Sequence, residues 1–180
     1  MKIKLFAIGL LALLMVGAAG PSFAGRANAA APSAHVASAT GSHAAFLDKT
    51  RFLIDMGVAF WCIHHVYTKY KSGYYASGES GRAKHIIAAG IVLFIAYNRL
   101  QAAYKTANKS NSPTLHKLVS PLNTLLGKTQ STATALKGGA ADPKSINDLN
   151  STTSQVGSQA HSGGYSIKDI QPPVGVPAGA

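Results

Sequence analysis

Cys62, His64, His65 and His85 are the side chains in this sequence that are best suited to chemistry. Three of them fall in the short segment Trp61–His65, and His85 follows about twenty residues later. Imidazole and thiolate groups are ligands for iron, copper and zinc. No nucleophile elbow, phosphate-binding glycine loop or H-E-x-x-H motif accompanies them. These residues therefore indicate a bound metal or a metal-containing cofactor, and the chain is expected to be an electron carrier rather than an enzyme.

The spacing of the histidines around an intervening loop predicts that they lie close together. The loop is centred near residue 77, with His64 and His65 about twelve residues before it and His85 about eight after. In an antiparallel helical hairpin, a rise of about 1.5 Å per residue brings these positions to within roughly one turn of each other. Two imidazoles that face inward from neighbouring helices can bracket a haem iron. One haem is therefore the expected cofactor, with His64 or His65 and His85 as axial ligands.

The neighbours of the histidines suit a flat apolar cofactor. Small residues at positions 88–90 leave room for a porphyrin beside His85. Aromatic and aliphatic side chains at helical spacing are available to enclose its faces, namely Phe60, Trp61, Tyr67, Leu93 and Phe94.

Cys62 distinguishes two ways of holding the haem. Cys62 and His64 are two residues apart, about 200° around a helix, so they cannot serve one haem from the same face. Cys62 and His65 are three residues apart and can do so. His64 as the ligand favours haem in the bundle core, whereas His65 permits a single thioether from Cys62 at the flank. The usual attachment motif, C-x-x-C-H, is absent, and a shielded free thiol is the alternative to the thioether.

Apolar residues at helical spacing predict that four helices position these side chains. The expected helices cover about residues 44–71 and 82–107, then Pro113 to Gly138, and Pro143 to about His161. Short links make consecutive helices antiparallel neighbours, so the predicted fold is all-α, an up-down-up-down four-helix bundle. The inner stripe expected on the first helix comprises Phe46, Leu53, Gly57, Phe60, His64 and Tyr67.

The N-terminus has the three parts of an export signal. Lys2 and Lys4 precede the apolar run Leu5–Val16, and small residues in Ser22-Phe23-Ala24 form a cleavage site. Residues 1–24 are therefore expected to be a cleaved signal peptide, which predicts a periplasmic or secreted protein. The later apolar run Ile86–Tyr97 is too short for a membrane span, so no stable span is expected in the mature chain.

The rest of the chain is expected to form one domain between two flexible segments. Residues 25–43 are rich in Ala, Ser and Gly and are predicted to be a flexible leader. The helical bundle domain is expected to cover 44–161. Residues 162–180 are predicted to be a Gly/Pro-rich tail.

Composition narrows the class of protein further. The chain carries 17 Lys and Arg against 6 Asp and Glu, but the basic residues are scattered singly, which argues against nucleic acid as a partner. Acid unfolding largely reflects the protonation of native carboxylates, so a chain with so few of them suits an acidic medium. The single cysteine excludes a disulfide framework, and an exported fold must then rely on its core.

Export, the lack of disulfides, the few carboxylates, the four helices and Cys62 beside paired histidines resemble the acid-stable red cytochromes of iron-oxidising acidophilic bacteria, of the cytochrome 579 type. This resemblance covers the mature chain in size and character. It implies a haem-carrying periplasmic protein that accepts electrons originating from ferrous iron. Its implied partners are redox proteins of the periplasm or outer membrane.

Two other functions fit the same residues. Cys62, His64, His65 and His85 are acceptable ligands for copper or zinc, which would make the chain a periplasmic metal-binding helical protein. In the third interpretation the chain is a cofactor-free exported structural protein in which the histidines are incidental.

Overall fold

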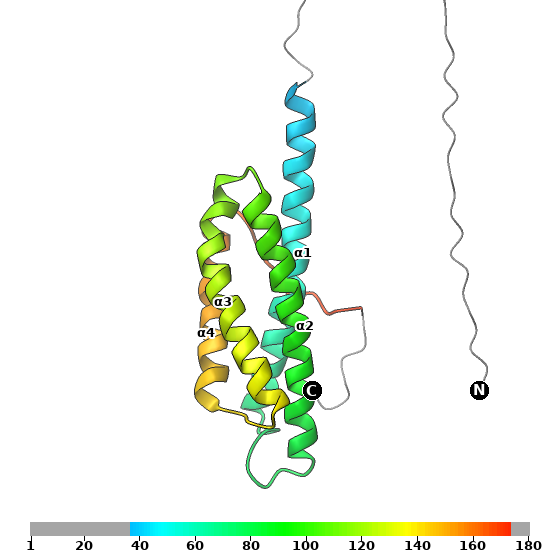
Figure 1. Ribbon diagram of the computed structural model, residues 1–180, viewed down its shortest axis with the longest axis vertical. Coiled ribbons are helices and arrows are strands. Elements are labelled where there is room, and N and C mark those ends of the chain that lie inside the picture. The colour runs from blue at the N-terminus through cyan, green and yellow to red at the C-terminus, as the bar shows by residue number, and fades with distance from the viewer. Residues whose placement is uncertain (1–36, 174–180) are drawn as a thin grey trace, which may run out of the picture. The chain divides into compact units, whose positions relative to one another are not determined.

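Four helices account for most of the part of the chain that can be described. The computed structural model describes the backbone of residues 37–173 and the side chains from residue 46 onward. The helices are α1 (Ala37–Lys71), α2 (Arg82–Lys109), α3 (Pro113–Lys137) and α4 (Pro143–Ser162), and residues 37–173 contain no strand (Figure 1). The all-helical class with four packed helices is confirmed. The predicted signal peptide lies outside the described residues.

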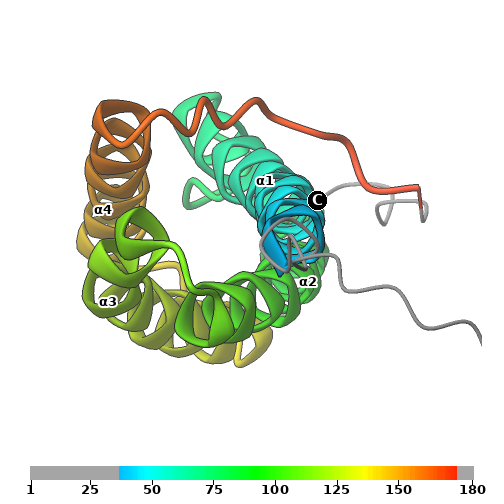
Figure 2. The same ribbon diagram turned by 90° about the horizontal axis from the view of Figure 1, so that it is seen from above.

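The helices follow one another around a common interior. Each packs against its neighbour in the chain, and α4 also contacts α1 (Figure 2). The contacts of α2 with α1 and α3 are the most extensive, and those between α1 and α4 are the fewest. One side of α1 is therefore covered by α2, while its other side is only partly covered by α4.

Local sequence signals explain most of the helix ends. The hydroxyl of Ser112 accepts a hydrogen bond from the backbone N–H of Leu115 at the start of α3, where Pro113 takes the first helical position. Asp142 caps α4 in the same way, accepting from Lys144 and Ser145. These two helix starts are confirmed as predicted.

The first helix differs from the prediction at its N-terminal end. It ends at Lys71 as expected, but it begins at Ala37 rather than near residue 44. Residues 37–45 include four alanines, and alanine has the highest helix propensity, so the helix extends into a segment that lacks apolar periodicity. The predicted flexible leader, 25–43, thus overlaps the beginning of α1.

The buried face of α1 also differs from the predicted stripe. Its core positions are Phe52, Met56, Ala59, Cys62, Ile63 and Val66, each at most 1% exposed. Phe46 is 66% exposed, and His64 and Tyr67 are only partly buried. Because α1 carries apolar residues around most of its circumference, periodicity alone did not identify the face that packs against the other helices. The structure places Cys62 in the core and His64 at its edge.

The second helix forms the wall shared by α1 and α3. Apolar residues at helical spacing face its neighbours: Ile86, Ala89, Leu93, Ala96 and Leu100 are all fully buried, and Tyr104 in the same series is partly buried. By length and hydropathy α2 is the one helix in the described residues that meets the criteria for a membrane span, with a mean hydropathy of 1.6 over an 18-residue window. Half of that window is buried against the rest of the fold, which is typical of a core helix.

Gly90 permits the close approach of α2 and α3. A Cβ atom at this position would lie 2.7 Å from the backbone nitrogen of Lys137 and 3.1 Å from the carbonyl oxygen of Ala133. These are backbone atoms at the end of α3, so they cannot move aside as a flexible side chain would. A larger residue at position 90 must therefore separate the two helices.

We predict that Gly90→Ala lowers the free energy of unfolding, whereas Gly127→Ala raises it. Overpacking costs about 1–3 kcal/mol, which exceeds the helix-propensity gain of at most about 1 kcal/mol. Gly127 is the matched control, because it is exposed in α3 and a Cβ there would meet nothing within 4 Å. Urea unfolding followed by far-UV circular dichroism measures both variants, and equal stability of the two would contradict the close approach.

Candidate functional site

The thiol of Cys62 is sealed inside the bundle. The side chain is fully buried, and burial raises the pKa of Cys62 to about 12, although the positive charge of Arg99 on α2 acts in the opposite direction. Metal binding and nucleophilic attack need the thiolate. The structure therefore holds this residue in its neutral, unreactive form.

His64 lies at the edge of the core, on a different side of α1. Its side chain is 38% exposed, and its ring meets the ring of Phe60 edge-on at 5.9 Å between centroids. The Nδ1 atom lies 2.8 Å from the Oδ2 atom of Asp169. Its closest polar partner thus comes from the C-terminal segment, 105 residues away in the chain.

Residues 163–173 fold back from the end of α4 to α1, as Figure 2 shows. The backbone N–H of Ile170 donates to the carbonyl oxygen of Gly57 at 3.0 Å. Tyr165 is buried, with its ring edge-on to Phe52 and its hydroxyl 3.2 Å from that of Ser112. This part of the predicted tail, 162–180, is irregular as expected, but it is packed on the bundle.

His65 and His85 each lie against an aromatic ring. The imidazole of His65 stacks on Trp61, with 4.8 Å between ring centroids and 13° between planes. His85, in the first turns of α2, meets Tyr74 edge-on at 5.3 Å. Both histidines are partly buried.

An ion pair between the first two helices sets the relative levels of the histidines. Arg99 Nη1 lies 3.3 Å from Asp55 Oδ1. His64 is nine residues along α1 from this level and His85 is fourteen along α2, which corresponds to an axial separation of about 7.5 Å. This is more than the single turn, about 5.4 Å, that the sequence predicted.

The surroundings of the candidate ligands differ around the bundle. His64 is bound to the C-terminal segment, whereas His85 packs on the loop between α1 and α2. Within residues 46–173, no three His, Cys, Asp or Glu side chains form a group that could hold a metal ion. The structure thus places all four predicted residues near one end of the α1–α2 pair without gathering them into one cluster.

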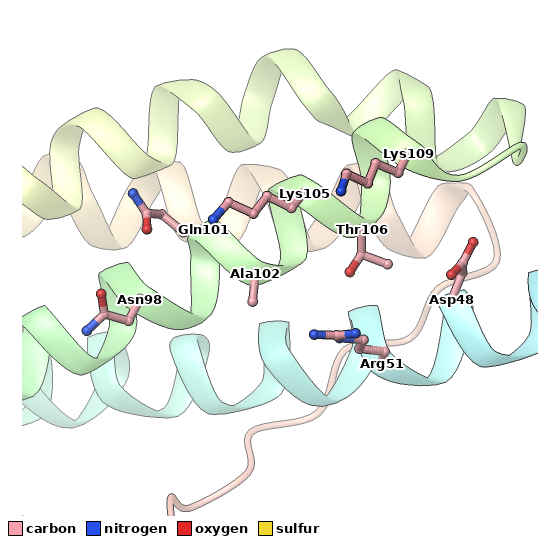
Figure 3. A pocket seen from close by; sticks show the side chains of 8 residues that line it. All are labelled: Asp48, Arg51, Asn98, Gln101, Ala102, Lys105, Thr106 and Lys109. Atoms are coloured by element: carbon pink, nitrogen blue, oxygen red, sulfur yellow. The ribbon is translucent and has the colours of Figure 1, made fainter.

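The surface grooves lie apart from these residues. Figure 3 shows one of about 410 Å³ between α1 and α2, lined by Arg51, Lys105 and Lys109 among mostly polar side chains. Three further grooves of about 400 to 770 Å³ lie along α1, α2, α3 and α4. None of these four is lined by Cys62 or by a histidine.

Asp169 is the site residue that sequence reasoning missed. It lies in a Gly/Pro-rich stretch without apolar periodicity, and nothing in the spacing of the chain connects it to His64. The local signals are the apolar residues Ile167 and Ile170 on either side of Lys168 and Asp169. They indicate a segment that can pack apolar side chains against the rest of the fold.

No protein family, curated protein or solved structure matches this chain.

We predict that Cys62 resists alkylation in the folded, haem-free protein. Raising the pKa from 9.0 to about 12 lowers the thiolate fraction about a thousandfold, and burial adds a steric barrier. Mass spectrometry after iodoacetamide treatment should show no adduct in buffer and one adduct in denaturant. Ser131→Cys in a Cys62→Ser background is the exposed control, and native labelling of Cys62 at the rate of this control would contradict the burial.

Proposed function

We propose that this protein is an exported haem-binding electron carrier of an acidophile's iron-oxidation chain. The single observation that carries the proposal is the setting of its histidines. His64, His65 and His85 each pack partly buried against an aromatic ring, on two neighbouring helices. Imidazoles in apolar, aromatic surroundings provide both iron ligands and a surface for the faces of a porphyrin.

The histidines and Cys62 differ in how well they suit a haem. The histidines suit iron by their chemistry and their aromatic neighbours, but in this packing they are not gathered around one space, so one haem between two of them needs the surrounding side chains to rearrange. Cys62 does not fit a thioether in this packing, because its side chain is fully enclosed and attachment needs α1 and α2 to move apart. We therefore favour haem held by histidine ligands over haem held by a covalent bond.

Haem supplies one-electron uptake and release when it is bound. The chain's own residues would hold the haem and shield it from water. Two of the imidazoles would hold the iron, and Phe60 and Trp61 pack against His64 and His65 and would shield them.

Several features support the location and fold in this proposal. The signal-like residues 1–24 favour export, and the scarcity of carboxylates favours an acidic compartment. The links of α1 to α2, α2 to α3 and α3 to α4 lie at alternate ends in Figure 1, which supports the up-down-up-down order. The exposed apolar residues Ile87, Ile91 and Phe94 on α2 offer a contact surface for a redox partner.

The copper or zinc alternative has less support in residues 46–173, because no group of three ligands occurs there. The cofactor-free alternative predicts a colourless protein. Both can be tested with the same preparation as the haem proposal.

Protein purified from its host is expected to show a Soret band and a positive pyridine haemochrome test. Its intact mass should correspond to a chain that begins at or near Gly25 and carries no haem, because the cofactor is held by ligands alone. His85→Ala, together with His64→Ala or His65→Ala, should shift the spectrum toward high-spin iron. His116→Ala is the matched control, since His116 is exposed on α3.

Three outcomes would contradict parts of this proposal. A colourless protein without metal would leave the cofactor-free alternative, and a colourless protein with stoichiometric copper or zinc would favour the metal alternative. A mass increased by one haem in denaturant would show that Cys62 is attached after all.

A further inference from the structure

We propose that the groove between α1 and α2 that Figure 3 shows is a binding site for inorganic phosphate. The site is separate from the histidines. Along α1, Arg51 of the groove precedes Asp55 of the interhelical ion pair, whereas His64 follows it. The inference therefore does not depend on the proposed haem.

Cations from two helices meet in this groove. Arg51 lies on α1, and its side chain extends toward α2 in Figure 3. Lys105 and Lys109 lie on α2. Arg51 is four residues before Asp55, about 6 Å along α1, and Lys105 is six residues after Arg99, about 9 Å along α2. Both positions lie on the side of this ion pair that is away from the loop between the helices, so the two charges are at nearly the same level.

The fold itself does not use these charges. Among the described side chains, neither ion pair includes a cation of the groove. Lys105 and Lys109 are four residues apart on one helix, where like charges destabilise each other. The helix dipole accounts for Lys109 in the last turn of α2, but Arg51 is far from either end of α1. A bound anion would relieve the repulsion between the three groups.

The lining of the groove suits a small oxyanion. The guanidinium group of Arg51 presents parallel N–H donors that match two phosphate oxygens, and each lysine adds a point charge. Asn98 and Thr106 contribute an amide and a hydroxyl from α2. Only Ala102 is apolar among the eight lining residues, so an apolar ligand would find little surface to cover.

Asp48 gives the groove a reason to prefer phosphate to other oxyanions. It is the one carboxylate among the lining residues, and an ionised carboxylate can only accept hydrogen bonds. At neutral pH inorganic phosphate carries at least one proton, which it can donate to Asp48. Sulfate carries none, so Asp48 repels it. The combination of three cations with one acceptor therefore points to phosphate.

The test is a titration of the mature protein with sodium phosphate at pH 7, followed by ¹H–¹⁵N NMR. Chloride keeps the ionic strength constant, so that screening of the net charge does not change during the titration. We expect saturable shifts of the amides of residues 48–51 and 98–109. Sulfate should bind about tenfold more weakly or less well still, because it loses a charge-assisted hydrogen bond and is repelled by Asp48.

Charge-removing variants locate the site. Arg51→Gln and Lys105→Gln should each weaken phosphate binding about tenfold or more, the effect of losing a hydrogen bond to a charged group. Lys84→Gln is the matched control, because it removes the same charge from an exposed position near the other end of α2. Its effect should be less than about twofold, since salt screens a distant charge. Asp48→Asn should reduce the preference for phosphate over sulfate.

Three results would overturn the inference. Shifts that do not saturate, or that spread over all four helices, would exclude a phosphate site in this groove. An equal loss of affinity in Lys84→Gln and Arg51→Gln would show general attraction to a basic protein. Equal affinity of the parent protein for sulfate and phosphate would overturn the assignment to phosphate.

Discussion

The approach of residues 168–170 to the backbone of α1 at Gly57 is the contact on which the candidate site depends. It places a carboxylate beside His64 on α1. A second glycine, Gly157 of α4, also permits a close approach, because a Cβ there would lie 3.1 Å from the ring of Phe60. The lack of a Cβ atom at Gly57 and Gly157 therefore allows the C-terminal segment and α4 to pack close to α1 beside His64.

Two of the other five carboxylates stabilise the fold. Asp55 pairs with Arg99 between α1 and α2, and Asp142 caps α4. Hydrogen bonds from the side chain and backbone of Ser145 lower the pKa of Asp142. Because this pKa is lower in the folded state, the stability that Asp142 contributes is present above its unfolded pKa. That contribution is lost as the pH falls through the folded pKa.

Sequence reasoning predicted the elements that have local causes. Ser112-Pro113, Asp142-Pro143 and the glycine after Lys71 each determine a helix end through interactions within a few residues. On α2 the helical spacing of the apolar residues also indicates the buried face, because charged residues occupy the opposite face. On α1 the predicted stripe was only partly right: Gly57 and Phe60 are buried, but Phe46 is exposed. Apolar residues surround most of that helix, and only its neighbours decide which side is covered.

The partner of His64 could not be predicted for a different reason. Asp169 reaches His64 through a backbone hydrogen bond and a close approach at Gly57, and neither leaves a periodic pattern in the sequence. A Gly/Pro-rich stretch after the last helix is usually a tail, and only the packing of Tyr165 and Pro172 shows otherwise.

Amide hydrogen exchange at Ile170 is the most direct measurement of whether the C-terminal segment is built into the fold and can fix His64. If its N–H donates to Gly57 as the structure has it, exchange should be slowed to a degree comparable with amides in α4, and Gly57→Ala should remove that protection. Exchange at the rate of an unstructured peptide in the parent protein would contradict the docking of this segment and, with it, the contact between Asp169 and His64.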